Sequence, residues 1–287
     1  MHAPAAVAST RCGFAGYSAV VIYEGIRRPV RSRRAALAAA LAYAALTAAA
    51  PVPGADVPNV AAASDLQFAL PAIAAAFKRA SGRDVRLSFG SSGNFRRQIG
   101  QGAPFELFLS ADASYVESLA RERWSADDGV VYAIGRLALF VPQGSPIEPD
   151  PELRGVAAAL ADGRLRKFAI ANPEHAPYGR AARQVLMRAG LWAAIEPRLV
   201  LGENISQAAQ FAVGGAAQGG IVAYSLARSP ALAGRGRYVL LPAADHDPLV
   251  QRMVLAKRAG ATARAFYEFL QQPAARAILG RHGFQVP

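Results

Sequence analysis

The feature that most constrains this fold is a short apolar run that passes through a polar turn into an amphipathic run. It occurs at residues 168–190, where Phe-Ala-Ile-Ala precedes Asn-Pro-Glu-His-Ala-Pro-Tyr-Gly and apolar residues then recur at helical spacing up to Gly190. The pattern predicts a buried strand, a turn and a helix that begins at Pro177, where a missing N–H costs nothing. Such a helix start presents unpaired backbone N–H groups and a partial positive charge, which together favour an anion.

Three further turns of the same kind occur along the chain. They lie at Ser64, at Ser91 and Ser92, and at Ile205. Each turn comes directly after an apolar run and is followed by an amphipathic run. Strands that alternate with helices predict an α/β fold with largely parallel sheets, in which ligands bind beyond the carboxyl ends of the strands. If the four turns meet at one cleft, they offer hydroxyl and backbone N–H groups to an anion. The small residues around Ser92 favour close approach of a ligand to the backbone.

The predicted elements follow from apolar periodicity and turn residues. Strands are expected near 57–63, 85–89, 105–110, 130–141, 168–171, 199–201, 220–224, 238–241 and 249–256, and helices near 66–81, 95–99, 113–121, 153–160, 177–190, 207–213, 261–271 and 273–281. Ser64 is expected to cap the first helix, and Pro71 to kink it or delay its regular part.

Two long segments are expected to cross between two lobes. The segment 130–141 leads out of the first lobe, and the strands between 238 and 256 return the chain to it. The sequence therefore predicts one lobe from residues 56–137 and 243–287, and a second lobe from residues 138–242.

The first 55 residues differ in composition from the rest of the chain. Five arginines between Arg27 and Arg34 precede 35–50, a run of sixteen residues that is almost entirely alanine and leucine. A basic segment, an apolar core too short to span a bilayer comfortably and then small residues are typical of a secretory signal peptide. Cleavage is expected between about Ala50 and Ala55. Residues before Arg27 are interpreted as an upstream extension.

The cysteine content and the net charge of the chain limit the kinds of function that it can have. The only cysteine, Cys12, lies in the expected signal segment, so the mature chain should contain neither a disulfide nor thiolate chemistry. Without residues 1–55 the chain has 26 basic and 19 acidic residues, and its net charge falls from +12 to +7. The basic residues are scattered, which argues against nucleic acid as a partner, although a moderately basic surface favours attraction of an anion.

Catalytic and metal-binding motifs are weak. Residues 90–94 (Gly-Ser-Ser-Gly-Asn) depart from the G-x-S-x-G nucleophile motif, because asparagine stands where the second glycine belongs. The histidines of the mature chain show no metal-ligand spacing, and His175 is expected to bond the backbone of its turn. A hydrolase that uses Ser91 or Ser92 stays open as an alternative, which a base within reach of either serine would favour.

Five motifs, taken in order, resemble the periplasmic molybdate-binding proteins of ABC transporters. They are Ala-Ala-Ala-Ser at 61–64, Phe-Gly-Ser-Ser at 89–92, Leu-Phe-Leu-Ser-Ala-Asp at 107–112, Asn-Pro-Glu-His-Ala-Pro-Tyr-Gly at 172–179 and Gly-Glu-Asn-Ile at 202–205. The resemblance runs from about residue 57 to Phe284. It implies the two-lobed α/β periplasmic binding protein fold of type II, with two crossing strands between the lobes, and a binding function without catalysis.

The resemblance also implies which residues hold the ligand. The family binds its oxyanion through serine hydroxyls and main-chain N–H groups, and these roles carry over to Ser64, Ser92, Tyr178 and Ile205. Members with alanine at the Tyr178 position contribute only the backbone there, so the role of the ring stays open. In some members a tyrosine after the Gly-Ile-Val strand touches the ligand. Here that position is Ala223, and Tyr224 comes one residue later, so Tyr224 is not expected to bind.

The resemblance predicts a monomeric periplasmic receptor that delivers molybdate or tungstate to a membrane-embedded ABC permease. The metal is expected only as an oxyanion, with no metal cation and no cofactor. Receptors for sulfate, phosphate or an organic acid are alternatives. A site of neutral donors predicts an affinity that changes little from about pH 6 to 8.5, provided that Asp65, beside Ser64, points away along its helix. The choice between molybdate and tungstate stays open.

Overall fold

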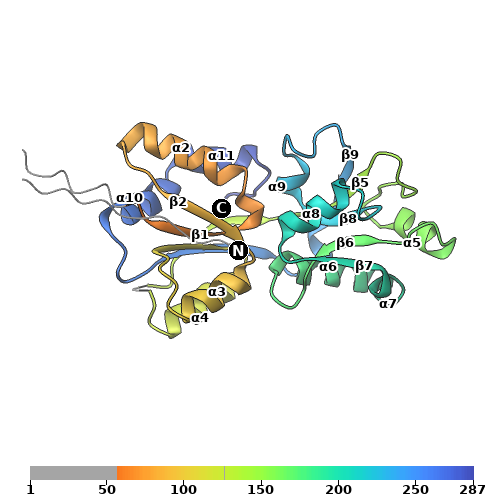
Figure 1. The fold of residues 1–287 in the computed structure, drawn as a ribbon, viewed down its shortest axis with the longest axis horizontal. Coiled ribbons are helices and arrows are strands. Elements are labelled where there is room, and N and C mark those ends of the chain that lie inside the picture. Colours follow the sequence, from red (N-terminus) through yellow and green to blue (C-terminus); the bar gives the residue numbers. More distant parts are fainter. Residues whose placement is uncertain (1–56, 126) are drawn as a thin grey trace, which may run out of the picture. The chain divides into compact units, whose positions relative to one another are not determined.

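The computed structural model describes residues 57–125 and 127–287. The expected signal peptide and upstream extension, residues 1–55, lie outside the described residues. The described chain forms two five-stranded sheets with helices packed on their faces (Figure 1). We call the elements around the first sheet lobe 1 and those around the second sheet lobe 2.

Lobe 1 contains a sheet with the strand order β2-β1-β3-β10-β4. Its strands are β1 (Asn59–Ala63), β2 (Arg86–Gly90), β3 (Leu107–Ser110), β4 (Val130–Gly135) and β10 (Leu249–Leu255). Its helices are the 3-10 turn η1 (Ser64–Leu66), α2 (Ala69–Ser81), α3 (Ser92–Gly100), α4 (Ala113–Arg121), α10 (Ala261–Leu270) and α11 (Pro273–Arg281). Strand β1 pairs in parallel with β2 and β3, and Val60 lies opposite both Leu87 and Leu107.

Lobe 2 contains a sheet with the strand order β7-β6-β8-β5-β9. Its strands are β5 (Leu137–Pro142), β6 (Phe168–Ala171), β7 (Leu199–Gly202), β8 (Gly220–Ala223) and β9 (Gly236–Leu240). Its helices are α5 (Arg154–Ala161), α6 (Pro177–Arg188), α7 (Trp192–Ile195), α8 (Ile205–Val213), α9 (Tyr224–Ala227) and the 3-10 turns η2 (Glu196–Arg198) and η3 (Ala243–Asp245). The strand β6 pairs in parallel with β7 and β8.

The crossing strands make both sheets mixed rather than largely parallel, so that part of the prediction is wrong. Strand β10 pairs antiparallel with β3 and β4, and β5 pairs antiparallel with β8 and β9. Only Arg136 separates β4 from β5. Each of β5 and β10 therefore enters its sheet from the side at which the parallel strands end, and must run against them. The two-lobed α/β fold with two crossing connections is confirmed.

The start of the first long helix differs from the expectation. Ser64 opens η1, whose N-cap is Ala63 without a side-chain cap, so Ser64 does not cap a long helix. The regular helix α2 begins only at Ala69 and carries Pro71 in its first turn, as expected if proline delays the regular part. Gly82 ends α2 in the left-handed region at φ 71°, where a residue without Cβ is unstrained.

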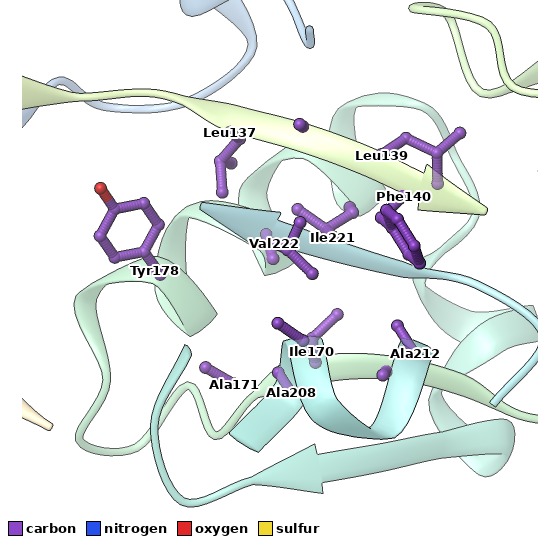
Figure 2. Close-up of a cluster of buried hydrophobic side chains, with 14 of the residues drawn as sticks. Leu137, Leu139, Phe140, Ile170, Ala171, Tyr178, Ala208, Ala212, Ile221 and Val222 are labelled. Atoms are coloured by element: carbon purple, nitrogen blue, oxygen red, sulfur yellow. The ribbon is translucent and has the colours of Figure 1, made fainter. Parts of the chain in front are cut away.

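A hydrophobic cluster fills lobe 2 between its sheet and its helices. The cluster includes Leu137, Leu139, Phe140, Ile170, Ala208, Ala212, Ile221 and Val222 (Figure 2). Tyr178 lies at one end of this group, with its hydroxyl oxygen directed away from the aliphatic side chains. This packing positions the N-terminus of α6. None of the helices among residues 57–125 and 127–287 has the length and apolar character needed to span a membrane.

Candidate functional site

A small cavity lies where turns of the two lobes meet. Its lining consists of Ala63, Ser64, Asp65, Gly90, Ser91, Ser92, Ala111, Ala176, Pro177, Tyr178 and Ile205. The structure therefore brings together the four residues predicted to bind the ligand, Ser64, Ser92, Tyr178 and Ile205. The space measures no more than about 190 Å³, below the range of about 300–1,000 Å³ for sites of drug-sized molecules. A small ion suits this volume.

Three helices begin at this cavity with a backbone amide that has no partner among the described residues. Ser92, Tyr178 and Ile205 lie in the first turns of α3, α6 and α8. Within the described parts of the chain, their N–H groups make no hydrogen bond. Because unpaired buried N–H groups are costly and helix N-termini favour negative charge, an oxyanion in the cavity would find these three donors.

The hydroxyl groups of Ser64 and Ser92 each accept a hydrogen bond from the backbone. Oγ of Ser92 accepts from the N–H of Ala111 at 3.0 Å, and Oγ of Ser64 accepts from the N–H of Ser206 at 3.4 Å. Each hydroxyl keeps its own hydrogen to donate. The hydroxyl of Ser206 donates in turn to the Ser64 carbonyl at 2.8 Å. Ser206 was not predicted, although it directly follows Ile205 in a turn that the sequence singled out.

Ser91 and His175 join the two lobes at one side of the cavity. Ser91 caps α3 by accepting from the N–H of Asn94 at 3.3 Å. Its Oγ lies 3.0 Å from both the carbonyl oxygen and Nδ1 of His175, whose Nε2 is 3.5 Å from Oε2 of Glu203. The ring of His175 thus contacts a side chain instead of the turn backbone. A base within reach of a serine is the condition stated for the hydrolase, but here a backbone carbonyl competes for the serine hydrogen.

Gly93 explains why residues around Ser92 are small. Its N–H donates to the His175 carbonyl at 3.1 Å, and a Cβ added at Gly93 would lie 2.5 Å from that oxygen. The sequence-based interpretation assigned the small residues to the approach of a ligand. At Gly93 it is the backbone of lobe 2 that approaches, so this glycine permits contact between the lobes.

Asp65 lies inside the cavity wall, so the prediction that it points away is wrong. The residue is 1% exposed. Its Oδ2 accepts from the Tyr178 hydroxyl at 2.8 Å and from Nε2 of Gln251 at 2.6 Å, whereas Oδ1 is buried without a hydrogen-bond partner among the described residues. The prediction failed because η1 is one short turn followed by a break, so the Asp65 side chain is not on the surface of a long helix.

Burial raises the pKa of the Asp65 carboxyl to about 6, although hydrogen bonds from Gln251 and Tyr178 act in the opposite direction. Burial, together with the nearby Asp65 carboxyl, also raises the pKa of the Tyr132 and Tyr178 hydroxyls well above 10. Both hydroxyls therefore stay protonated. The Tyr132 hydroxyl donates to Oε1 of Gln251 at 2.7 Å, which places the amide nitrogen of Gln251 toward Asp65. Neither Tyr132 nor Gln251 was singled out from the sequence.

The two tyrosines considered from the sequence have different positions. The hydroxyl of Tyr178 is engaged by Asp65 and by Gln251, whose Nε2 lies 3.1 Å away. A Cβ at Gly135 would collide with this hydroxyl, so glycine makes room for the ring. Tyr224 opens α9, and its ring packs against Tyr238 with ring centres 6.0 Å apart. Tyr224 does not line the cavity.

Basic side chains lie at the rim instead of in the cavity. Arg180 of α6 pairs with Asp112 and donates to the Tyr115 hydroxyl at 2.8 Å, and Asn94 donates to Glu203 across the lobes. The lining formed by described residues contains no lysine, arginine or histidine. Nor do three or more His, Cys, Asp or Glu side chains gather as a metal-ion site within residues 57–125 and 127–287.

Known proteins match this chain along most of its length. Residues 58–285 match the family model of the bacterial extracellular solute-binding proteins. The chain is 38% identical over 233 residues to the molybdate-binding protein ModA of Rhodobacter capsulatus, covering 79% of this chain and 88% of that protein. It is 34% identical over 229 residues to ModA of Azotobacter vinelandii, with the same coverage. The solved structure of the Azotobacter vinelandii periplasmic molybdate-binding protein superposes with a TM-score of 0.72 and 31% identity, over 80% of this chain and 99% of that one.

Proposed function

The chain belongs to the bacterial extracellular solute-binding proteins and groups with their molybdate-binding members, and from this premise we propose that it captures molybdate in the periplasm and delivers it to an ABC permease. Its relatives are binding proteins, and the chain is not an enzyme. The contact of Ser91 with His175 is accordingly assigned to the closing of the lobes instead of hydrolysis.

The observation that carries this proposal is the set of neutral donors around one small cavity. Three amides without a partner in the described part of the chain, those of Ser92, Tyr178 and Ile205, join the hydroxyls of Ser64 and Ser92. A tetrahedral oxyanion presents only acceptors, so each donor finds a partner. A hydrogen bond to a charged acceptor contributes about 1.5–3 kcal/mol. Several such bonds, less the cost of closure, reach the roughly −8 kcal/mol of micromolar binding.

Closure of the lobes supplies the signal for delivery. Contacts such as Gly93 N–H to the His175 carbonyl and Ser206 to Ser64 exist only when the lobes are together. A bound anion that bonds both lobes favours this arrangement over an open one. We propose that the permease recognises the closed form of a monomer.

The proposal extends to tungstate. The N–H and O–H donors of this site form hydrogen bonds with the oxygens of the anion. They do not contact its central atom directly. Two tetrahedral dianions of similar size should therefore bind alike. Export through the segment at residues 1–55 is part of the same proposal, and the mass of the periplasmic protein tests it: a protein that keeps Arg33 and Arg34 would contradict cleavage.

Asp65 favours a second candidate function. A buried carboxylate in the cavity wall can accept a hydrogen bond from a protonated oxyanion. Hydrogen phosphate carries such a proton and would meet an acceptor at Oδ1, which has no partner among the described residues. A phosphate receptor is therefore the alternative that the structure supports most directly.

Calorimetric titration of the mature protein with molybdate, tungstate, sulfate and phosphate at pH 7 tests the proposal. We expect micromolar or tighter binding of molybdate and tungstate, and at least about tenfold weaker binding of sulfate and phosphate, because a bond lost or left unpaired costs about 1–3 kcal/mol. Phosphate affinity within tenfold of molybdate affinity, abolished by Asp65→Asn, would make the protein a phosphate receptor.

A further inference from the structure

The Asp65 carboxyl is the feature of the cavity that a site of neutral donors does not explain. Its Oδ2 accepts two hydrogen bonds, from Tyr178 and Gln251. Its Oδ1 is buried, lies in a residue that lines the cavity and makes no well-aligned hydrogen bond with residues 57–125 and 127–287, although the backbone N–H groups of Asp65 and Leu66 lie near the carboxyl. Buried polar atoms in native proteins almost always have a partner, so a group that enters the cavity is expected to supply one.

An ionised Asp65 carboxylate repels an anion in the same cavity. The groups that act on its carboxyl are Gln251, Tyr178 and the backbone N–H groups of residues 65 and 66, and none of them carries a positive charge. A dianion placed in the same cavity adds two negative charges beside the carboxylate. Like charges in one site favour the protonated form of the weaker acid, as when two carboxylates share a single proton.

We propose that binding of the oxyanion takes up one proton from solvent, which is held on Oδ1 of Asp65 and donated to an oxygen of the bound anion. The inference rests on the proposed function. In this step a carboxylate, a solvent proton and a tetrahedral dianion give a neutral carboxyl hydrogen-bonded to the intact dianion. No bond of the anion breaks. Asp65 is then a further donor of the site and a determinant of which oxyanion binds.

The surrounding residues place the proton on Oδ1 and not elsewhere. Oδ2 is already occupied by two donors, and the Gln251 amide is oriented by the Tyr132 hydroxyl. The Tyr178 hydroxyl bonds Asp65 and the Tyr132 hydroxyl bonds Gln251, and both stay protonated, since the pKa of each is well above 10. Burial has already raised the pKa of Asp65 to about 6 in the closed cavity, and an adjacent dianion raises it further.

A histidine also lies near the cavity. His175 contacts Ser91 and Glu203 at the junction of the lobes, and histidines bind protons near neutral pH. The experiment must therefore separate Asp65 from His175. The remaining contact of Asp65 from lobe 2, the Ser225 hydroxyl on the Asp65 carbonyl at 2.9 Å, involves no titrating group.

Because of the proton taken up by Asp65, the selectivity of the site depends on pH. Above about pH 7 the free Asp65 is ionised, so a dianion must bring a proton from solvent and its affinity falls as pH rises. Hydrogen phosphate carries its own proton and needs none from solvent. The preference for molybdate over phosphate should therefore decrease between pH 7 and 8.5.

Calorimetry of the mature protein with molybdate, in two buffers of different ionisation enthalpy at pH 7.5, measures the number of protons taken up. We expect about one proton for the wild-type protein, and a Kd that rises about tenfold per pH unit between pH 7 and 8.5. In Asp65→Asn the amide nitrogen replaces the protonated Oδ1 as donor. We expect this variant to take up no proton and to have a Kd that is constant over the same range. His175→Asn should still take up about one proton.

Each outcome decides the inference. Molybdate binding by the wild-type protein without proton uptake, or uptake that disappears in His175→Asn and persists in Asp65→Asn, would overturn it. These wild-type and His175 results suffice even if Asp65→Asn does not fold, which circular dichroism would reveal. If the wild-type protein binds no molybdate at all, the proposed function itself fails, and the inference fails with it.

Discussion

Lobe 1 and lobe 2 share one strand order but supply different chemistry to the cavity. In each sheet three parallel strands are followed by an antiparallel strand that comes from the other lobe and then by one further strand. Lobe 1 contributes the side chains of Ser64, Asp65 and Ser92 together with the backbone amide of Ser92. Lobe 2 contributes the backbone amides of Tyr178 and Ile205, while the hydroxyl of Tyr178 is bound to Asp65.

The backbone donors of lobe 2 arise from how its helices begin. In α6 the N-cap is Ala176 and no side chain caps the helix, so the Tyr178 amide is left unpaired. In α8 the side chain of Asn204 caps the amides of Ser206 and Gln207 but leaves that of Ile205. Affinity should therefore depend on side chains and the Ser92 amide in lobe 1, and on backbone groups alone in lobe 2. The lobes should respond unequally to substitution.

The largest expected effect comes from removing both hydroxyls of lobe 1. Ser64→Ala with Ser92→Ala removes two hydrogen bonds to a charged ligand, each contributing about 1.5–3 kcal/mol. Molybdate affinity measured by calorimetry should fall more than about a hundredfold. Thermal unfolding without ligand provides the check on folding. A loss of less than tenfold in a folded variant would show that side chains of lobe 1 do not hold the anion.

A smaller loss is expected from Gly93→Ala, which tests the contact between the lobes. The new Cβ would meet the His175 carbonyl oxygen, and overpacking of this kind costs about 1–3 kcal/mol. Affinity should fall roughly tenfold to a hundredfold, while stability without ligand changes little, because an open form lacks the clash with His175 and the Tyr115 hydroxyl, which the Cβ also meets, is the end of a side chain that can shift. Gly280→Ala in α11 is the matched control, since a Cβ there meets nothing within 4 Å. Equal effects of the two variants would contradict the assignment.

The backbone role of lobe 2 can be tested at Ile205 itself. Proline is tolerated at the first helical position, and Asn204 has an extended backbone (φ −150°, ψ 175°) of the kind favoured before proline. Ile205→Pro therefore removes the amide donor without breaking α8. We expect roughly a tenfold or larger loss of affinity, equivalent to one bond of about 1.5–3 kcal/mol. Ile205→Val keeps the amide and should bind within about twofold of wild type. A larger loss of affinity in Ile205→Val than in Ile205→Pro would show that the Ile205 side chain contributes more to binding than the Ile205 amide.

The smallest effect is expected at the rim. Arg180→Ala removes the pair with Asp112 and the bond to Tyr115. Partly exposed ion pairs contribute about 0.2–1 kcal/mol, so molybdate affinity should fall less than about fivefold. The loss should also shrink when the titration is repeated at high salt, since screening weakens exposed pairs. A loss larger than that of Ser92→Ala would mean that charge, and not neutral donors, builds the site.

Local sequence patterns predict most of the helices and strands. Pro177 begins α6 and Gly82 ends α2, because proline and glycine impose their conformations on the chain directly. The four strand-to-helix turns were also visible, since each combines an apolar run with a cap or a small residue. Their meeting at one cavity could be expected from the rule that ligands bind at the carboxyl ends of strands.

Local sequence patterns did not predict the contacts between residues that lie far apart in the sequence. Gln251 reaches Asp65 across 186 residues, and Ser206 reaches Ser64 across 142. Nothing in the local sequence around Gln251 distinguishes it from any other strand residue. The antiparallel pairing of β5 and β10 was missed for a related reason, because strand direction depends on the lobe from which the chain arrives.

The sequence by itself determined that this chain is an α/β protein with two lobes, with a helix that begins at Pro177 and further helices that follow the turns at Ser92 and Ile205. These properties depend on local backbone preference and on apolar periodicity, which are encoded within a few residues of each other. Only the tertiary structure decided where Asp65 points and how its carboxyl is paired. The orientation and pKa of a buried carboxyl depend on the desolvation and hydrogen bonds that distant strands and helices impose on it, and those exist only after the lobes have come together.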